Sequence, residues 1–421
     1  MKLRLLALGS ALVLTACGGG GLDTPVAVAT PSPAPTAAPT AAPAKAVQWQ
    51  AQLPAAGSAV CFDFDAGSEV ACSTANWDLK LASATRGVSL WSNSGESGSG
   101  KGGVFGSPFD YTWSALQKWQ AGLLDPTTGQ AIPDTLYLKD TADSVFTGSN
   151  GIQSKAFEYG VGGSNDHKLY PNFRVFLVTT DHSAASATGN STSPVYALQM
   201  TGYYGGQSGT TSGYPSFRWV DRSVAGAPVR DATVDARTGW VYFNLTSGQA
   251  VAESDAWHIA FNRYNVKLNS GTSGTGKVGG FLAKTPAGFY AADGSTPVAA
   301  KFTENNILAT TLPDLTASDL QLPTQASQWK KDSVASKLNP AYQGNYPGKL
   351  DFGWYSYYPV ANGAIVAHSQ VANPDRGTLL RSAEGNSYAR VRLKEIRYAT
   401  PGNVSSQQTW QFEFETLPAN K

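Results

Sequence analysis

The sequence predicts a mostly β fold, in which two tandem antiparallel β domains follow an export signal and a Pro/Ala-rich tether. Glycine fills 44 of 421 positions and aromatic residues make up 11%, a composition typical of short strands joined by turns. The length allows two or three domains with cores of their own. A net charge of +1, with only 14% charged residues, gives no broad attraction to polyanions, so we expect no nucleic-acid partner.

The N-terminus predicts export and lipidation. Lys2 and Arg4 precede an apolar run, residues 5–13, that is too short to span a bilayer. The following Leu-Thr-Ala-Cys, residues 14–17, resembles the lipobox of bacterial lipoproteins, which predicts a signal peptide over 1–16 and acylation of Cys17. Gly18 after the cysteine favours the outer membrane, with the surface-facing or periplasmic side left open. The alternative is an ordinary secretory signal with a cysteine there by chance.

Residues 17–45 begin with the cysteine that we expect to be lipidated. The rest is predicted to be a disordered tether of Pro, Ala and Thr. The six prolines at near-regular spacing favour an extended, polyproline-like chain that holds the folded part away from the membrane.

Cys61 and Cys72 flank a segment whose centre, residues 65–68, resembles a hairpin turn. Because export favours oxidation, we expect a disulfide across this hairpin. The alternatives are two buried thiols or a metal pair, and the pair is disfavoured because no His or third Cys lies nearby in the sequence.

An internal repeat organises the rest of the chain. The first copy begins at Val60 and runs through Trp77 to a glycine-rich loop at 93–101. A similar segment begins at Val241 and runs through Trp257 to a similar loop at 269–277. The later halves also correspond, and each copy closes on alternating aromatic residues typical of a half-buried strand. We therefore expect two β domains, over residues 46–225 and 226–421.

The glycine-rich loops contain Asn-Ser-Gly-x-Ser-Gly-x-Gly-Lys, which suggests a phosphate-binding loop. We reject that interpretation, because Gly102 and Val278 stand where a Walker loop has Ser or Thr. Tight connections that need glycine at positive φ explain the pattern better.

The run from Trp257 to Gly274 resembles the signature of the HmuY family, and the first copy matches it in part. Arg174 to Val178 is also similar to a strand of that family. The resemblance implies a largely β lipoprotein that binds haem or a related planar tetrapyrrole and passes it to an uptake system. Its implied partners are the membrane, through the lipid anchor, and a TonB-dependent outer-membrane receptor.

The family binds haem through two axial His or two axial Met, and the resemblance makes His167 and His368 the ligand candidates here. No second ligand is evident, because residues 135–160 and 305–358 contain neither His nor Met. We therefore also consider one site shared between His167 and His368. Tyr can ligate haem iron too, and the candidates for the ligand slot are aromatic: Tyr159, Trp354, Tyr357 and Tyr358. We expect no metal other than haem iron.

Simpler roles compete with these assignments. A loop histidine is commonly only hydrogen-bonded, and aromatic residues on strands commonly pack the sheet. His258, in an apolar strand where the family carries Asp, is better explained as a structural histidine. No catalytic motif is evident, so we expect no enzyme. The rival function is a surface adhesion or carbohydrate-binding module without metal chemistry, and a further alternative is that the first copy has become a structural partner only.

Overall fold

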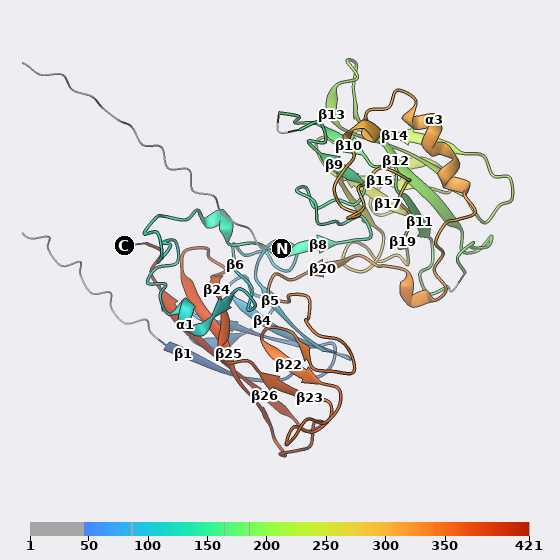
Figure 1. Cartoon of the computed structure of the whole chain (residues 1–421). Coiled ribbons are helices and arrows are strands. Elements are labelled where there is room, and N and C mark those ends of the chain that lie inside the picture. The colour runs from blue at the N-terminus through green and yellow to red at the C-terminus, as the bar shows by residue number, and fades with distance from the viewer. Residues whose placement is uncertain (1–45, 86, 164, 185, 421) are drawn as a thin grey trace, which may run out of the picture. The chain divides into compact units, whose positions relative to one another are not determined.

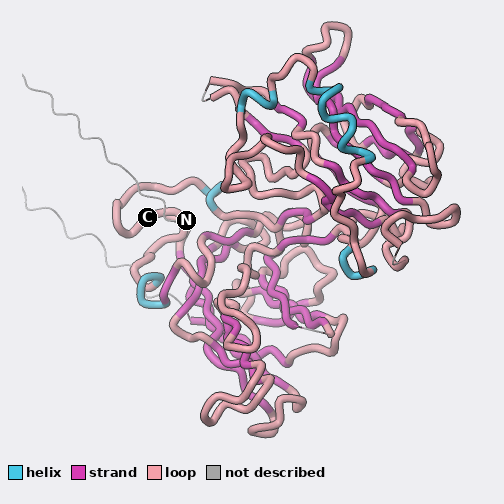
Figure 2. The backbone as a smooth tube through the Cα atoms, turned by 45° about the vertical axis from the view of Figure 1, so that its right-hand side comes forward, coloured by secondary structure: helices cyan, strands magenta, loops and turns pink. Residues whose placement is uncertain are grey.

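The computed structural model describes residues 46–420 except 86, 164 and 185. The predicted signal peptide, Cys17 and the whole predicted tether therefore lie outside the described residues. The fold is mostly β, as predicted, and each strand pair in the described chain is antiparallel. Figure 2 shows strands and loops with few helical turns. No helix in the described ranges is long and apolar enough to cross a bilayer.

The first and last strands of the described chain pair with one another. β1 (Ala46–Gln52) runs antiparallel to β26 (Gln408–Leu417), with Trp49 opposite Phe412. Figure 1 shows this directly, because the blue β1 lies beside the red β25 and β26. Segments more than 350 residues apart in the sequence therefore share one sheet.

One core joins residues 46–140 to residues 336–420, which we call the enclosing lobe. Its buried centre combines Trp49, Phe62 and Leu81 with Trp410 and Phe414. Its strands are, in sheet order, β1, β26, β25 (Tyr388–Tyr398), β24 (Arg376–Arg381) and β6 (Gly103–Phe105), with β7 (Tyr111–Thr112) on β24; then β3 (Ser68–Val70), β2 (Ala59–Asp63), β4 (Leu79–Ala84) and β5 (Gly87–Ser92); then β21 (Leu350–Asp351), β22 (Tyr355–Tyr358) and β23 (Ser369–Ala372).

A second core lies wholly within residues 144–332, which we call the nested lobe. Phe176, Leu198 and Trp219 pack there against Phe243 and Phe261. Its strands are, in sheet order, β14 (Arg230–Thr233), β13 (Thr211–Asp221), β12 (Val195–Gly205), β11 (Val175–Thr179) and β19 (Gly279–Lys284); then β16 (Gln249–Val251), β15 (Val241–Asn244), β17 (Ile259–Asn262) and β18 (Asn265–Leu268); then β10 (Leu169–Pro171) and β9 (Phe157–Tyr159).

The helices of both lobes are short and peripheral to the sheets. Arg218 on β13 donates to the Leu308 carbonyl of α3, and this hydrogen bond fixes α3 to the sheet. They are α1 (Trp113–Leu116), α2 (Ala299–Phe302), α3 (Ile307–Thr311), η1 (Asp134–Leu136), η2 (Leu312–Thr316) and η3 (Ala326–Gln328).

These pairings correct the predicted division at residue 225. Residues 46–225 and 226–421 do not each form a core of their own, because both cores draw on both segments. The nested lobe takes the second half of the first copy and the first half of the second copy. The enclosing lobe takes the other two halves.

The chain crosses between the lobes at matching points of the two copies. β8 (Thr141–Asp143) pairs antiparallel with β20 (Ser333–Ala335), with Ala142 opposite Val334. Each crossing follows a buried aspartate whose backbone N–H donates to a serine of a glycine-rich loop, Asp140 to Ser94 and Asp332 to Ser270. Each lobe therefore combines one half from each of the two similar segments, and a short two-stranded ribbon lies at the crossing. A repeat in the sequence shows which segments are alike. It does not show whether the first half of one copy packs against the second half of the same copy or of the other copy.

Candidate functional site

Two tyrosine–histidine pairs lie in matching hairpins of the two lobes. Tyr357 Oη is 2.8 Å from His368 Nδ1 in the enclosing lobe. Tyr159 Oη is 3.0 Å from His167 Nδ1 in the nested lobe. The structure therefore joins the four residues, which the sequence had nominated separately, into two pairs, one in each lobe.

The strand register shows that the two hairpins are equivalent. Tyr357 is opposite Gln370 on β22 and β23, and Tyr159 is opposite Leu169 on β9 and β10. In both hairpins the N–H of the opposite residue donates to a tyrosine hydroxyl of the neighbouring long strand. These bonds are Gln370 to Tyr398 at 2.8 Å and Leu169 to Tyr204 at 2.9 Å.

The chemistry of each pair leaves one donor atom free. Among the described residues, neither His167 Nε2 nor His368 Nε2 makes a hydrogen bond, and both histidines are exposed. When the other ring nitrogen is hydrogen-bonded, the ring is held in one orientation and its free nitrogen can bind a metal. When the tyrosine gives its proton to Nδ1 instead, its oxygen becomes the metal ligand.

The surroundings of the two pairs differ. The hairpin of Tyr357 and His368 exposes three valines, with exposed fractions of 54% at Val360, 38% at Val366 and 37% at Val371. His368 also has a φ of +65°, which is rare for a residue with a side chain. The corresponding loop, residues 160–168, is mostly glycine and polar. Among the described residues, the hairpin of Tyr357 and His368 therefore exposes more apolar surface than the hairpin of Tyr159 and His167.

The other two aromatic candidates for the ligand slot, Trp354 and Tyr358, do not take part in either tyrosine–histidine pair. Trp354 is 2% exposed, packs in the core, and donates from Nε1 to Leu338 O at 2.6 Å. This burial means that Trp354 packs the sheet and does not present its face to a large ligand. Tyr358 is partly exposed, and its carbonyl accepts from the His368 N–H at 2.7 Å.

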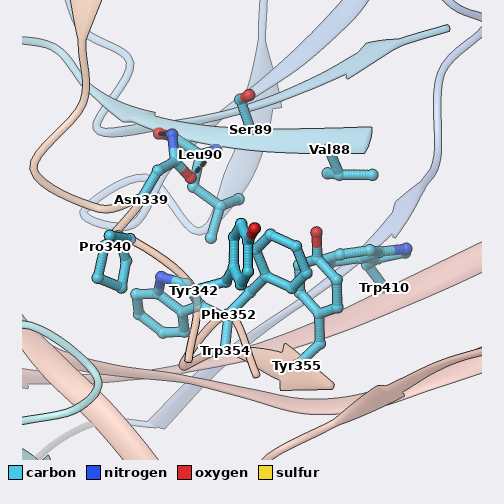
Figure 3. Close-up of a pocket in the computed structure, with 11 residues that line it drawn as sticks. Val88, Ser89, Leu90, Asn339, Pro340, Tyr342, Phe352, Trp354, Tyr355 and Trp410 are labelled. Carbon is cyan, nitrogen blue, oxygen red and sulfur yellow. Dashed lines mark hydrogen bonds between the residues drawn. The ribbon is translucent and has the colours of Figure 1, made fainter. Parts of the chain in front are cut away.

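An aromatic cavity of about 250 Å³ lies beside Trp354. In Figure 3 the rings of Tyr342, Phe352, Tyr355 and Trp410 gather below the strand that carries Leu90. Phe352 and Tyr355 are stacked, with ring centroids 5.0 Å apart, and burial raises the pKa of Tyr355 to about 12. The cavity is smaller than the roughly 300–1,000 Å³ pockets of drug-sized ligands, so it cannot enclose a tetrapyrrole.

His258 has a structural role, which is the simpler of its two interpretations. Its Nδ1 accepts from the Leu245 N–H at 3.0 Å, and burial lowers its pKa to about 4. Asp78 in the first copy accepts from the Phe64 N–H at 2.9 Å in the same way. A neutral imidazole thus replaces a carboxylate as the acceptor for one backbone N–H.

The glycine-rich loops close around their own asparagines. Asn93 Oδ1 accepts from the Gly100 N–H at 2.8 Å, and Asn269 Oδ1 from the Gly276 N–H at 2.9 Å. A Cβ on Gly98 would lie 2.1 Å from Asn93 Oδ1, so a larger residue cannot fit there. The loops are therefore tight connections in both copies.

The other predicted and possible sites are internally satisfied. Cys61 and Cys72 form the predicted disulfide next to the β2–β3 hairpin. The carboxylates of Asp63, Asp65 and Asp78 cluster within 4.8 Å. Their oxygens accept hydrogen bonds from backbone and side-chain groups of the same lobe, so the cluster by itself assigns no metal.

A comparison with protein families matches residues 236–412 to the family described as HmuY protein. The match includes Tyr357 and His368, and it supports the resemblance to the HmuY family over that segment. The family suggests haem binding without catalysis. No curated protein matches the chain.

Sequence reasoning did not find the aromatic cavity or the neighbouring groove that contains Lys80 and Trp91. Lys80 and Trp91 become neighbours only because β4 and β5 pair in register, with the two residues directly opposite. The mixture of polar and apolar residues in both strands could have indicated a half-exposed sheet. It does not give the register between β4 and β5, so it could not show that Lys80 and Trp91 are opposite.

Proposed function

We propose that this protein captures haem, or a related planar tetrapyrrole, at the hairpin of Tyr357 and His368. The observation that carries the proposal is the tyrosine–histidine pair, which occurs at equivalent positions of both copies and, in the second copy, within the HmuY-matched segment. Haem iron accepts an axial ligand from His or Tyr, and the pair supplies both donor types.

In this proposal His368 Nε2 is the axial ligand and Tyr357 is a positioning residue. The hydroxyl of Tyr357 contacts Nδ1 and holds the ring, as an outer hydrogen bond commonly does for a ligating histidine. Val360, Val366 and Val371 supply exposed apolar surface for a flat macrocycle. This donor set fits an exposed slot with one protein ligand.

The proposal makes the two lobes unequal. The nested pair, Tyr159 and His167, lacks exposed apolar residues in its loop, so it binds more weakly. Each pair contains one histidine, so the tight site provides one axial nitrogen. These two features argue for separate sites rather than one site shared by both histidines.

The cellular part of the proposal rests on the N-terminal sequence and the family. Acylated Cys17 and the tether would anchor the folded chain at the outer membrane, where it would hand its ligand to a TonB-dependent receptor. Both copies would derive from one HmuY-like domain. The matching hydrogen bonds of the two hairpins and of the two glycine-rich loops support this derivation.

A haemin titration of residues 46–421, followed in the Soret band, tests the proposal. We expect one tight equivalent, a five-coordinate or water-ligated spectrum, and at least about ten-fold weaker binding for His368→Ala. His167→Ala is the matched control and should leave the tight site unchanged. Tyr357→Phe should weaken binding but keep the nitrogen-ligated spectrum.

A flat titration would exclude haem capture. Tight binding that His368→Ala leaves intact would exclude this site. A tyrosinate spectrum that Tyr357→Phe abolishes and His368→Ala retains would reverse the assigned roles of the two residues.

A further inference from the structure

A polar groove lies on the outer face of the β3–β2–β4–β5 sheet. Alternate residues of a strand point to opposite faces. Phe62, Leu79, Leu81 and Leu90 face the core of the enclosing lobe. Ala59, Lys80, Ala82, Ser89 and Trp91 line the groove, whose volume is about 790 Å³.

Lys80 is the cation of the groove. Its Nζ lies 4.7 Å from the ring centre of Trp77 and 5.6 Å from that of Trp91, and 3.5 Å from the Ser97 carbonyl. In the described part of the chain it forms no ion pair, and burial lowers its pKa. The Asp140 carboxylate acts on this ammonium from beyond ion-pair distance, and no carboxylate contacts it directly, so the ammonium can still pair with an anionic group.

Hydroxyl groups line the same groove as this cation. Ser58, Ser83, Ser89 and Thr272 all line the groove, and their side-chain oxygens make no hydrogen bond with any described residue. Trp91 is partly exposed beside them. The groove thus combines free hydroxyls, one aromatic face, one cation and one exposed carboxylate, that of Glu96.

The wall of the groove that contains Ser336 and Asn339 is hydrogen-bonded to β5. The Asn339 side chain donates to Leu90 O at 2.9 Å and accepts from Leu90 N at 3.0 Å, and Ser336 Oγ donates to the same carbonyl at 2.6 Å. Figure 3 shows Asn339 beside Leu90. The wall is therefore pre-formed, which limits the entropy lost on binding.

The nested lobe has a different arrangement at the equivalent row. Cys61, Lys80 and Trp91 are neighbours across one sheet, and Tyr242, Ala260 and Lys267 are neighbours across the other. Lys267 is 4.3 Å from the ring centre of Trp240 and also contacts Tyr242 and Trp257. Its ammonium lies over three of the protein's own rings, whereas the Lys80 ammonium lies over two and lines the groove.

We propose that this groove binds an acidic oligosaccharide. A uronate carboxylate would pair with Lys80, a sugar ring would lie against Trp91, and the serine and threonine hydroxyls would bond to sugar hydroxyls. An acidic carbohydrate fits better than a densely charged anion, because one cation and one carboxylate among many hydroxyls suit a polar ligand with sparse charge. This site is separate from the tyrosine–histidine hairpins and does not depend on haem capture.

Calorimetric titration of residues 46–421 with trigalacturonate tests the inference, with maltotriose as a neutral trisaccharide of the same length. We expect saturable binding of trigalacturonate and binding at least about ten-fold weaker for Lys80→Gln, the scale of one hydrogen bond to a charged group. Lys267→Gln is the matched control and should bind like the unaltered chain. Unchanged near-ultraviolet circular dichroism and melting temperature would show that both variants are folded.

Three results would overturn the inference. They are no binding of trigalacturonate, equal binding of maltotriose, and equal effects of Lys80→Gln and Lys267→Gln. Trp91→Leu provides a second test, because it keeps the cation but removes the aromatic face. It should weaken trigalacturonate binding and leave the fold intact.

Discussion

Replacing Trp49 with alanine should destabilise strands of the enclosing lobe that lie more than 300 residues away in the sequence and spare β11 to β13 of the nested lobe, which lie nearer in the sequence. Trp49 is 3% exposed. Its ring centre lies 5.1 Å from that of Phe62 and 5.4 Å from that of Phe412, and its Nε1 donates to Glu69 at 2.7 Å. The side chain therefore contacts β26 in the sheet of β1 and joins that sheet to β2 and β3 of a second sheet.

The expected cost follows from this burial. Removing a buried tryptophan side chain costs about 3–5 kcal/mol, against a stability of about 5–15 kcal/mol for a typical domain. Slow amide exchange in β24, β25 and β26 should accelerate by roughly 10²-fold to 10³-fold or more if exchange requires opening of the lobe. Exchange in β11, β12 and β13 should not change.

Hydrogen exchange with peptide-level mass spectrometry measures both regions at once. The control is Trp219→Ala, because Trp219 is also buried, with Nε1 donating to Leu245 O at 3.0 Å. This variant should accelerate exchange across residues 175–284 and leave β24 to β26 protected. Two consecutive domains would give the opposite result, with both variants affecting residues 46–225 together and β24 to β26 unaffected. That outcome would refute the arrangement in which each lobe combines halves of both copies.

Two further predictions concern the nested lobe. The pKa of His258, lowered by burial from 6.5 to about 4, means that the lobe is stabilised above pH 6.5 and loses that stability as the pH falls toward 4, by up to about 3 kcal/mol. His258→Asn should flatten this slope in urea unfolding, and an equal slope in both proteins would contradict the assignment. Gly271→Ala should destabilise the lobe by at least about 1–3 kcal/mol, because its φ is +57° and a Cβ would lie 1.9 Å from Asp332 O. Gly294→Ala, at φ +70° with open space around its Cβ, is the control and should cost about 1 kcal/mol; equal melting temperatures for the two glycine variants would show that the close contact is unimportant.

The candidate site was only partly predictable. His167, His368, Tyr159 and Tyr357 were nominated from the repeat and the family resemblance, but their pairing depends on the register of two hairpins. Trp354 was nominated as a slot residue, and the structure places it in the core, because an aromatic residue on a strand can face either side. Lys80 was not nominated, since its partner Trp91 lies on the next strand.

The sequence by itself determined the β class, the disulfide hairpin and the tight glycine-rich loops, and it predicted two similar copies. Each of these depends on local composition, short spacing or self-similarity. Only the tertiary structure decided which half of one copy packs against which half of the other. Similar halves bury similar apolar faces, so local sequence does not distinguish the two pairings; the joining of β1 to β26 and the crossing at β8 and β20 do.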